Sequence, residues 1–393
     1  MSRINKTFVR NVTILAGSSL SVLAATILAP ALPTMLAVFE QVPNSELLVR
    51  LVLTTPALFI AIGAPVSGFL LDRLGRKPVL LVGLIVYSLA GSAGFFLGSI
   101  YGILISRAIL GLSISAIMSG FTTLIIDYFE GRELDRFMGY QSAFISFGGM
   151  SWLFLGGILA DIGWRLVFLI HLIAVFIFVA SALTINEPSR KRTSGQERAS
   201  GAKSAVPYKK IGLIYLTTFI SITVFFIFPL QIPFYLASAS DIKSSLVGLA
   251  LSIQGFAGAI VALQYMRLKK FLSFPQIFIM IFIFFGINHL ILSQTDGYGY
   301  LVVALAVGGL GIGLLPANVN VWLASVVPGD VRGRAVGGLT MSLFFGQFLT
   351  PIITQPFLGA LGFRGMFFSF AIIAFIAAAV FSFVSLANRR KES

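Results

Sequence analysis

The 393-residue sequence contains no cysteine and few charged side chains. Without cysteine the chain has no disulfide framework, no thiolate zinc site and no cysteine nucleophile. Charged residues make up 11% of the sequence, whereas soluble globular domains carry about 25%. Hydrophobic residues make up 57%, which excludes a disordered chain. The composition therefore argues against a water-soluble enzyme and favours a protein embedded in a lipid bilayer.

Long apolar runs fill most of the sequence. A helix that crosses the hydrocarbon core of a bilayer needs about 20 predominantly apolar residues. Twelve runs meet this requirement, and they cover residues 12–36, 48–71, 78–97, 101–125, 138–160, 165–186, 211–237, 245–266, 275–293, 298–323, 336–358 and 365–387. We therefore predict an all-α integral membrane protein with twelve transmembrane helices.

The positive charges lie mostly on one side of this topology. With the N-terminus placed inside, 23 of the 28 Lys and Arg residues fall on cytoplasmic segments. Short loops rich in Lys and Arg stay in the cytoplasm, so both termini are predicted to be cytoplasmic. The same distribution accounts for the net charge of +14 without a nucleic-acid partner.

A polar segment at residues 187–210 separates two groups of six spans. Its Ser, Gly, Lys and Arg content is typical of a flexible linker. The predicted domains are therefore an N-terminal six-helix bundle (1–186), a cytoplasmic linker (187–210) and a C-terminal six-helix bundle (211–393). Asp161-Ile-Gly-Trp-Arg165 recurs as Ala360-Leu-Gly-Phe-Arg364, which indicates a parallel repeat of pseudo-symmetric halves.

The most specific string is Gly68-Phe-Leu-Leu-Asp72-Arg73-Leu-Gly75-Arg76-Lys77, between the second and third spans. Gly75 permits a tight turn, and the turn places one carboxylate beside three cations at a helix end. Asp72 could pair with an Arg or with the positive N-terminus of a neighbouring helix. Such a contact could act as a charge lock on the cytoplasmic side. The alternative interpretation is a positive-inside anchor.

This string resembles the loop signature of the major facilitator superfamily at every specified position. Finer features resemble its twelve-span drug:proton antiporter branch, namely Leu28-Ala-Pro30-Ala-Leu-Pro33, Ser106-Arg107-Ala-Ile-Leu-Gly111 and Gly163-Trp-Arg165. The resemblance implies a major facilitator fold and alternating access by a two-domain rocker-switch around one central cavity. It also implies a gating role for Gly68, Asp72, Arg73, Gly75, Arg76 and Lys77.

Two departures weaken the antiporter interpretation. Antiporters of this branch usually carry a Gly-Pro pair in span five, where this sequence has Trp152 and Leu153. In addition, the predicted spans contain no Asp or Glu in their interiors, although proton-coupled transporters commonly use a membrane-embedded acid or histidine. The alternative is a substrate-specific metabolite uptake carrier of the same fold, either a symporter or a facilitator.

Arg107 is the only Lys, Arg, Asp or Glu that the prediction places in the interior of a span, away from its ends. A charge at that depth costs at least about 2.5–3.5 kcal/mol, so we expect Arg107 to be paired with carbonyls, hydroxyls or substrate. Its role is then either a hydrogen-bond hub or a contact for an anion or a proton site. Proton carriers would have to be His171, His289 or an acid near a helix end, such as Asp127 or Asp161.

The remaining binding candidates rest on their position in the fold that the resemblance implies, in which the first, fourth, seventh and tenth helices line the cavity. The candidates for substrate contact or coupling, beside Arg107 and His289, are Thr26, Ser115, Met118, Phe226, Gln231, Gln254, Asn318 and Gln347. Pockets combine apolar walls with a few placed polar groups. The competing interpretation of each residue is helix packing.

The sequence thus favours a secondary transporter rather than an enzyme. We expect export of amphipathic small molecules (drug or metabolite efflux), coupled to protons by antiport, in the bacterial cytoplasmic (inner) membrane. The chain is expected to act as a monomer without cofactor or metal. Gly308-Gly-Leu-Gly311-Ile-Gly313 lies inside a predicted span rather than between a strand and a helix, so a nucleotide site is not predicted there.

Overall fold

The computed structural model describes residues 3–188, 207–239, 242–294, 297–328 and 331–392. These residues form helices joined by short turns, with no strand among them. The chain divides into two compact units, Met1–Ala205 and Val206–Ser393, which are described separately below. Most of the predicted linker lies outside the described residues, so its conformation stays a prediction.

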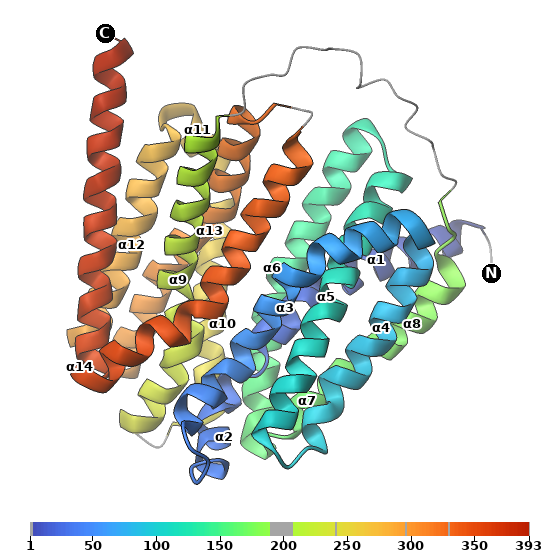
Figure 1. The fold of residues 1–393 in the computed structure, drawn as a ribbon, viewed down its shortest axis with the longest axis horizontal. Coiled ribbons are helices and arrows are strands. Elements are labelled where there is room, and N and C mark those ends of the chain that lie inside the picture. Colours follow the sequence, from blue (N-terminus) through green and yellow to red (C-terminus); the bar gives the residue numbers. More distant parts are fainter. Residues whose placement is uncertain (1–2, 189–206, 240–241, 295–296, 329–330, 393) are drawn as a thin grey trace. The chain divides into compact units, whose positions relative to one another are not determined.

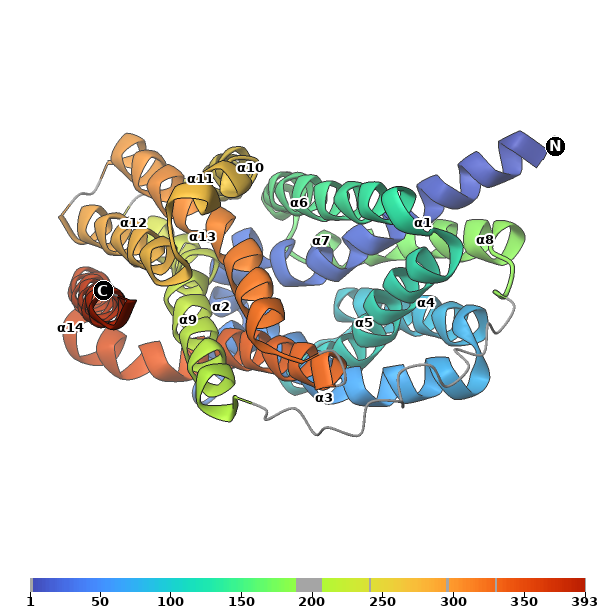
Figure 2. The same cartoon turned by 90° about the horizontal axis from the view of Figure 1, so that it is seen from above.

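The first unit contains the helices of the first six predicted spans (Figure 1). They are α1 (Arg3–Thr26), η1 (Ala29–Ala31), α2 (Leu32–Val38), α3 (Ser45–Leu74), α4 (Arg76–Ser92), η2 (Ala93–Phe95), α5 (Ile100–Tyr128), α6 (Gly131–Ile162), α7 (Leu166–Leu169), η3 (Ile170–Leu172) and α8 (Ile173–Thr184). Pro30 lies in η1, which interrupts the first span because proline cannot donate to an α-helical ladder. α5 packs against both α3 and α4 (Figure 2).

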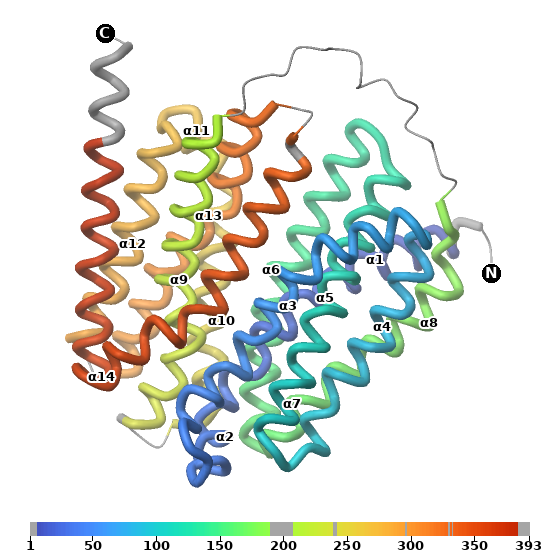
Figure 3. Tube along the Cα trace, in the orientation of Figure 1, coloured from blue at the N-terminus to red at the C-terminus, as the bar shows by residue number. Residues whose placement is uncertain are grey.

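The second unit contains α9 (Tyr208–Ala239), α10 (Ser244–Ala262), α11 (Tyr265–Phe271), α12 (Phe274–Gln294), α13 (Tyr298–Val326) and α14 (Arg332–Glu392). The predicted span 245–266 is therefore shorter than expected, and a separate helix, α11, follows it. Within α14, Gly362 has φ 65° and ψ −174°, and Figure 3 shows the helix turning back on itself.

The prediction of twelve membrane-spanning helices is confirmed. Eleven apolar segments of the described chain are long enough to cross a bilayer, and one of them, Gly333–Phe383, has 51 residues. The break at Gly362 divides this segment into the predicted eleventh and twelfth spans. A left-handed φ is readily available only to glycine, which explains why the reversal occurs at this residue.

Close helix packing in the first unit depends on glycines of α6. A Cβ added at Gly156 would overlap the carbonyl oxygen of Ile27, and one added at Gly148 would lie 2.7 Å from Cβ of Ser19. The absent side chains let α6 approach the α1–η1 segment closely, as small residues do at membrane helix interfaces. The interface therefore forms although Trp152 and Leu153 replace the Gly-Pro pair of the resembled branch.

Arg50 stands at the start of the predicted span 48–71, and the structure places it deeper in its helix. It lies in the second turn of α3 and is 2% exposed. Its Nη1 donates to the carbonyl of Glu46 at 2.8 Å and lies 3.4 Å from the Glu46 carboxylate. The helix begins earlier than the hydropathy pattern predicts, so this ion pair forms within the first turns of the membrane-spanning helix.

Candidate functional site

The turn between α3 and α4 is a network of hydrogen bonds and ion pairs centred on Arg76. We call residues Asp72–Lys77 the charged turn. Arg76 Nε donates to Asp127 Oδ2 at 3.0 Å, and Nη1 donates to the carbonyl of Leu71 at 3.0 Å. Nη1 also lies 3.6 Å from Asp72 Oδ1. Arg76 thereby joins the end of α3 to the end of α5.

Glu187, which follows α8, completes this network. Its carboxylate accepts from the backbone N–H groups of Arg76 at 2.7 Å and Lys77 at 2.8 Å. These N–H groups open α4, where a carboxylate is favoured by both hydrogen bonding and the helix dipole. Gly75 has φ 103°, and a Cβ there would lie 2.8 Å from Glu187 Oε1. Position 75 therefore requires glycine for two reasons: the positive φ of its backbone and the close approach of the Glu187 carboxylate.

Two more contacts tie the end of α8 to the same region. Lys77 Nζ donates to the carbonyl of Ala182 at 2.8 Å, and the Tyr128 hydroxyl donates to the carbonyl of Asn186. The guanidinium of Arg10 lies over the Tyr128 ring, 4.3 Å from its centroid. Five helices of the first unit, α1, α3, α4, α5 and α8, therefore meet at this end of the bundle.

The other predicted gating residues take different positions. The Asp72 side chain is 80% exposed, so most of its surface remains accessible to another partner. The Arg73 guanidinium lies 5.9 Å from the centroid of the Phe69 ring. A Cβ added at Gly68 would meet no atom within 4 Å, so packing within the described structure does not require glycine there.

Sequence reasoning missed the part that Glu187 plays, and it considered Asp127 only as a proton carrier. The available signal was that both acids lie at the ends of predicted spans, on the same side as the charged turn. That signal was too weak to pair them with particular residues, because 110 positions separate Lys77 from Glu187.

Arg107 is fully buried inside the first unit. Its Nη2 donates to the carbonyls of Ala90 at 3.1 Å and Gly91 at 2.6 Å, near the end of α4. Its guanidinium carbon lies 4.9 Å from the centroid of the Phe168 ring. The expected pairing with carbonyls is therefore present. Nε and Nη1 have no hydrogen-bond partner in the described structure, which leaves donors for a water molecule or another ligand.

The two histidines have similar environments in the two units. His171 Nδ1 bonds to the carbonyl of Phe168, and His289 Nδ1 bonds to the carbonyl of Phe285, both at 2.9 Å. Both residues are 0% exposed, and neither Nε2 has a partner among the described residues. His289 lies among aromatic rings, with its centroid 4.5 Å from that of Phe228.

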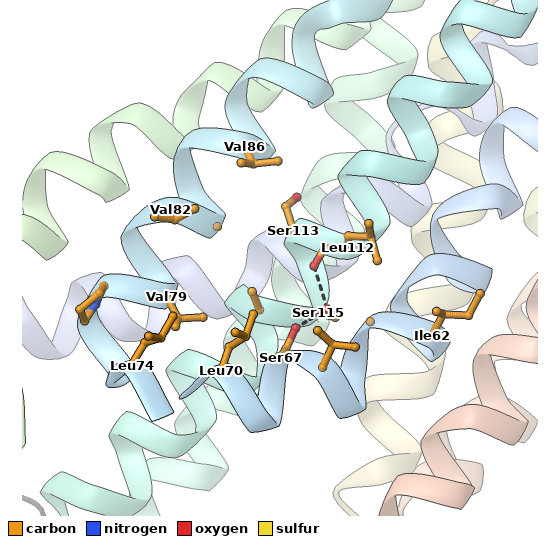
Figure 4. Close-up of a pocket in the computed structure, with 15 residues that line it drawn as sticks. Ile62, Ser67, Leu70, Leu74, Val79, Val82, Val86, Leu112, Ser113 and Ser115 are labelled. Atoms are coloured by element: carbon orange, nitrogen blue, oxygen red, sulfur yellow. Dashed lines mark hydrogen bonds between the residues drawn. The ribbon is translucent and has the colours of Figure 1, made fainter. Parts of the chain in front are cut away.

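The candidates in the first unit other than Arg107 lie on α1 and α5. Ser115 is buried and shares a 2.7 Å hydrogen bond with Ser67, across the interface of α3 and α5 (Figure 4). It lines an apolar groove of about 410 Å³ between α3, α4 and α5. Thr26 and Met118 are half-buried, and the Thr26 hydroxyl donates to the carbonyl of Val22.

The candidates in the second unit, beside His289, are buried within the bundle. Gln231 Nε2 donates to Thr354 Oγ1 at 3.1 Å, and Asn318 Nδ2 donates to the carbonyl of Phe274 at 3.2 Å. Phe226 and Gln347 are each 6% exposed. Their roles in binding stay predictions.

Gln254 lies next to Asn288, a polar residue that sequence reasoning did not single out. A Cβ added at Gly308 would lie 3.3 Å from Gln254 Nε2 and would overlap the Asn288 amide. Gln254 Nε2 and Asn288 Oδ1 are both buried and have no partner among the described residues. Buried polar groups are usually satisfied, so this pair is a local site for a water molecule or a polar ligand group.

The family model of the Major Facilitator Superfamily matches residues 14–285 and 213–393. The chain belongs to the major facilitator superfamily. The quinolone resistance protein NorA of Staphylococcus aureus (strain MRSA252) is 26% identical over 302 residues, which are 76% of this chain and 77% of NorA. Multidrug resistance protein 1 of Bacillus subtilis (strain 168) is 26% identical over 297 residues, 74% of this chain and 75% of that protein.

Solved structures of the superfamily share the fold. A bacterial homologue of the human lysosomal transporter Spinster superposes with a TM-score of 0.77 at 16% identity and covers 98% of each chain. The D-xylose-proton symporter gives 0.76 at 14% identity, covering 95% of this chain and 97% of that one. These matches confirm the predicted major facilitator fold.

Membership in the superfamily also confirms the predicted class of protein. The matched relatives are transporters and resistance proteins of bacteria rather than enzymes. The chain is therefore a multi-pass membrane transporter, and its bacterial relatives agree with a location in the bacterial inner membrane.

Proposed function

We propose that this transporter exports amphipathic small molecules from the cytoplasm by alternating access, driven by inward movement of protons. In this proposal both termini and the charged turn lie on the cytoplasmic side. The six-helix bundles 1–186 and 211–393 rock about a central substrate site, with residues 187–210 as their linker, and the transporter acts as a monomer.

The observation that carries the proposal is the similarity to two resistance proteins over about three quarters of each chain. The intact charged turn supports it, because Arg76 holds Asp72 and Asp127 within one network at a helix end. The apolar character of the described spans suits amphipathic cargo, since binding pockets for such molecules are mostly apolar.

Proton coupling needs a group that binds and releases a proton during the cycle. Within the described helices, every Asp and Glu lies near a helix end, so the carriers we propose to test inside the spans are His171 and His289. Each has an Nε2 without a partner in the described structure. We favour His289 because Arg107, a cation, lies in the same unit as His171 and contacts the same Phe168.

A facilitator or symporter for one metabolite is the second candidate. It is favoured by the same observation, the absence of a carboxylate from the middle of any described span. A facilitator would need no proton group in the membrane.

The deciding experiment uses purified protein in liposomes with an imposed pH gradient and a panel of cationic, neutral and anionic amphipaths. Antiport predicts that each exported compound moves against a substrate-dependent proton flux. His289→Gln should then abolish the dependence of transport on the pH gradient while leaving downhill exchange of the compound intact. His171→Gln is the matched variant in the other unit.

The outcomes separate the candidates. Movement of a compound without proton flux would establish a facilitator, and proton and compound moving together would establish a symporter. Unchanged coupling in His289→Gln would exclude His289 as the carrier without affecting the export proposal.

A further inference from the structure

Three apolar helices of the second unit, α10, α12 and α13, share a buried polar node formed by Gln254, Asn288 and Gly308. α13 packs against both α10 and α12. Gln254 lies ten residues after the start of α10, and Gly308 lies ten residues after the start of α13. Ten residues rise about 15 Å, which is half of the roughly 30 Å hydrocarbon core. Gln254 is 4% exposed and Asn288 0%, so the node is buried near the middle of the membrane.

Glycines of α13 hold both amide side chains in place. A Cβ added at Gly308 would overlap the Asn288 amide, and its absence lets Asn288 Nδ2 donate to the carbonyl of Ala304 at 2.7 Å. A Cβ added at Gly309 would overlap the carbonyl oxygen of Gln254, so α10 and α13 approach each other closely there. The bond to Ala304 also fixes the orientation of the Asn288 amide, because an oxygen in place of Nδ2 has no proton to donate.

The node leaves one donor and one acceptor unused. Gln254 Nε2 and Asn288 Oδ1 are buried and have no hydrogen-bond partner among the described residues. Both side chains reach the same position on α13, since a Cβ at Gly308 would lie 3.3 Å from Gln254 Nε2 and 3.0 Å from Asn288 Cγ. Buried donors and acceptors that stay unpaired cost free energy, and most are satisfied by protein or by ordered water. A ligand that satisfies this pair must accept from Gln254 and donate to Asn288.

The surroundings require that ligand to be uncharged. α10, α12 and α13 contain no Lys, Arg, Asp or Glu along their described lengths, and an unpaired ion is strongly disfavoured in such an environment. An anion also lacks the proton that Asn288 Oδ1 would accept, and a cation lacks the lone pair that would accept from Gln254 Nε2. A hydroxyl group supplies both, because its oxygen accepts and its O–H donates.

We propose that Gln254 and Asn288 together bind one hydroxyl group, which links α10 to α12 across Gly308 of α13. In the protein without cargo, the hydroxyl is that of a buried water molecule. The hydroxyl of a transported alcohol or phenol has the same chemistry and can take the place of the water, and this second source rests on the proposed export function. The node thus selects a neutral hydrogen-bonding group rather than a charged one.

The first test compares the thermal unfolding of the purified full-length protein with that of variants. Gln254→Met and Asn288→Leu each replace an amide by an apolar side chain of similar size. Each single variant leaves the bound hydroxyl and the other amide incompletely paired, so we expect the unfolding temperature to fall by about 2–4 °C. Asn320→Leu, at an exposed position of α13, is the control and should leave the temperature unchanged.

The double variant Gln254→Met/Asn288→Leu removes the whole site. It should lose less than the two single variants together, because replacing every partner of a buried hydrogen bond by apolar groups costs little. The double variant also keeps the test valid if a single variant does not fold, since it leaves neither amide unpaired.

The second test is a structure of the protein in nanodiscs, without added compound, by electron cryo-microscopy at a resolution that shows ordered water. We expect density within hydrogen-bond distance of both Gln254 Nε2 and Asn288 Oδ1. Binding of a labelled alkylphenol and of its methyl ether then identifies the source, because the ether accepts a hydrogen bond but cannot donate one. If cargo replaces the water, the phenol should bind about tenfold more tightly than the ether and lose this preference in the double variant. If water alone occupies the site, the two probes should bind equally.

Two results would overturn the proposal. Single variants that unfold at the same temperature as wild type, or at a higher one, would show that the site is empty, since removing an unpaired buried group relieves its cost. Direct contact between the two amides, with no density between them, would replace the ligand by a bond within the protein. Neither result depends on a transport assay, so this proposal and the export proposal fail separately.

Discussion

At the scale of single residues, Glu187 joins distant parts of the first unit. Its carboxylate accepts from two N–H groups that open α4, 111 and 110 positions earlier in the chain. Hydrogen bonds to a charged acceptor are about twice as strong as neutral ones. The residue that follows the sixth span therefore helps to hold the charged turn, and its loss should affect the turn more than the bundle.

We expect Glu187→Gln to slow transport several-fold with near-normal expression, because an amide keeps one acceptor oxygen and loses the charge. Glu187→Ala should slow it further. Transport rates in liposomes, normalised to the amount of reconstituted protein, measure the effect.

Glu133→Gln is the control, because Glu133 is an exposed acid in the first turn of α6. Equal rates for wild type and both Glu187 variants would show that the contact has no part in transport.

Arg107 stabilises the first unit through the carbonyls of Ala90 and Gly91. Arg107→Ala leaves these buried acceptors without their donor, which costs about 1–3 kcal/mol in the free energy of unfolding. Thermal unfolding of the purified protein should therefore begin at a lower temperature.

Arg132→Ala removes an exposed arginine of α6 and should leave the unfolding temperature unchanged. An Arg107→Ala variant as stable as wild type, but inactive, would instead assign Arg107 to the transport cycle alone.

At the scale of helices, α6 depends on glycine where it meets the α1–η1 segment. Gly156→Ala forces a methyl group against the carbonyl of Ile27. Overpacking of this kind costs about 1–3 kcal/mol, so we expect a lower unfolding temperature. Gly139→Ala changes the same helix where a Cβ meets nothing within 4 Å. That substitution should be neutral or stabilising by up to about 1 kcal/mol.

The two substitutions differ only in their packing environment. If both variants unfolded at the same temperature as wild type, the close contact of α6 with Ile27 would not contribute to stability.

At the scale of the whole molecule, transport requires a contact that forms in one state and breaks in another. Asp72 suits this requirement, since its side chain is 80% exposed and lies 3.6 Å from Arg76. Exposed ion pairs contribute only about 0–1 kcal/mol to stability. We expect Asp72→Asn to lower the transport rate about tenfold, the factor that about 1.4 kcal/mol produces, with a normal unfolding temperature.

Asp135→Asn, at an exposed position of α6, is the matched control and should transport like wild type. A normal rate in Asp72→Asn as well would dismiss the gating role of Asp72.

The sequence alone determined that the protein spans the membrane twelve times, because hydropathy depends on composition along the chain and needs no tertiary contact. The charged turn was also recognisable from the sequence, because its residues are neighbours along the chain. The sequence could not pair Arg76 with Asp127 and Glu187, or Arg107 with the carbonyls of α4. Such pairings depend on which helix ends meet in space, and hydropathy carries no information about that.

Only the tertiary structure decided how the polar and small residues of the spans are used. Ser115 shares a hydrogen bond with Ser67, and its role in binding stays a prediction. The glycines of α6 let this helix approach the α1–η1 segment closely, although the Gly-Pro pair is missing. The stripe from Ile62 to Leu74 could have packed against another helix, yet it lines a groove. The reason is geometric, since an apolar face has the same periodicity whether it meets protein or lipid.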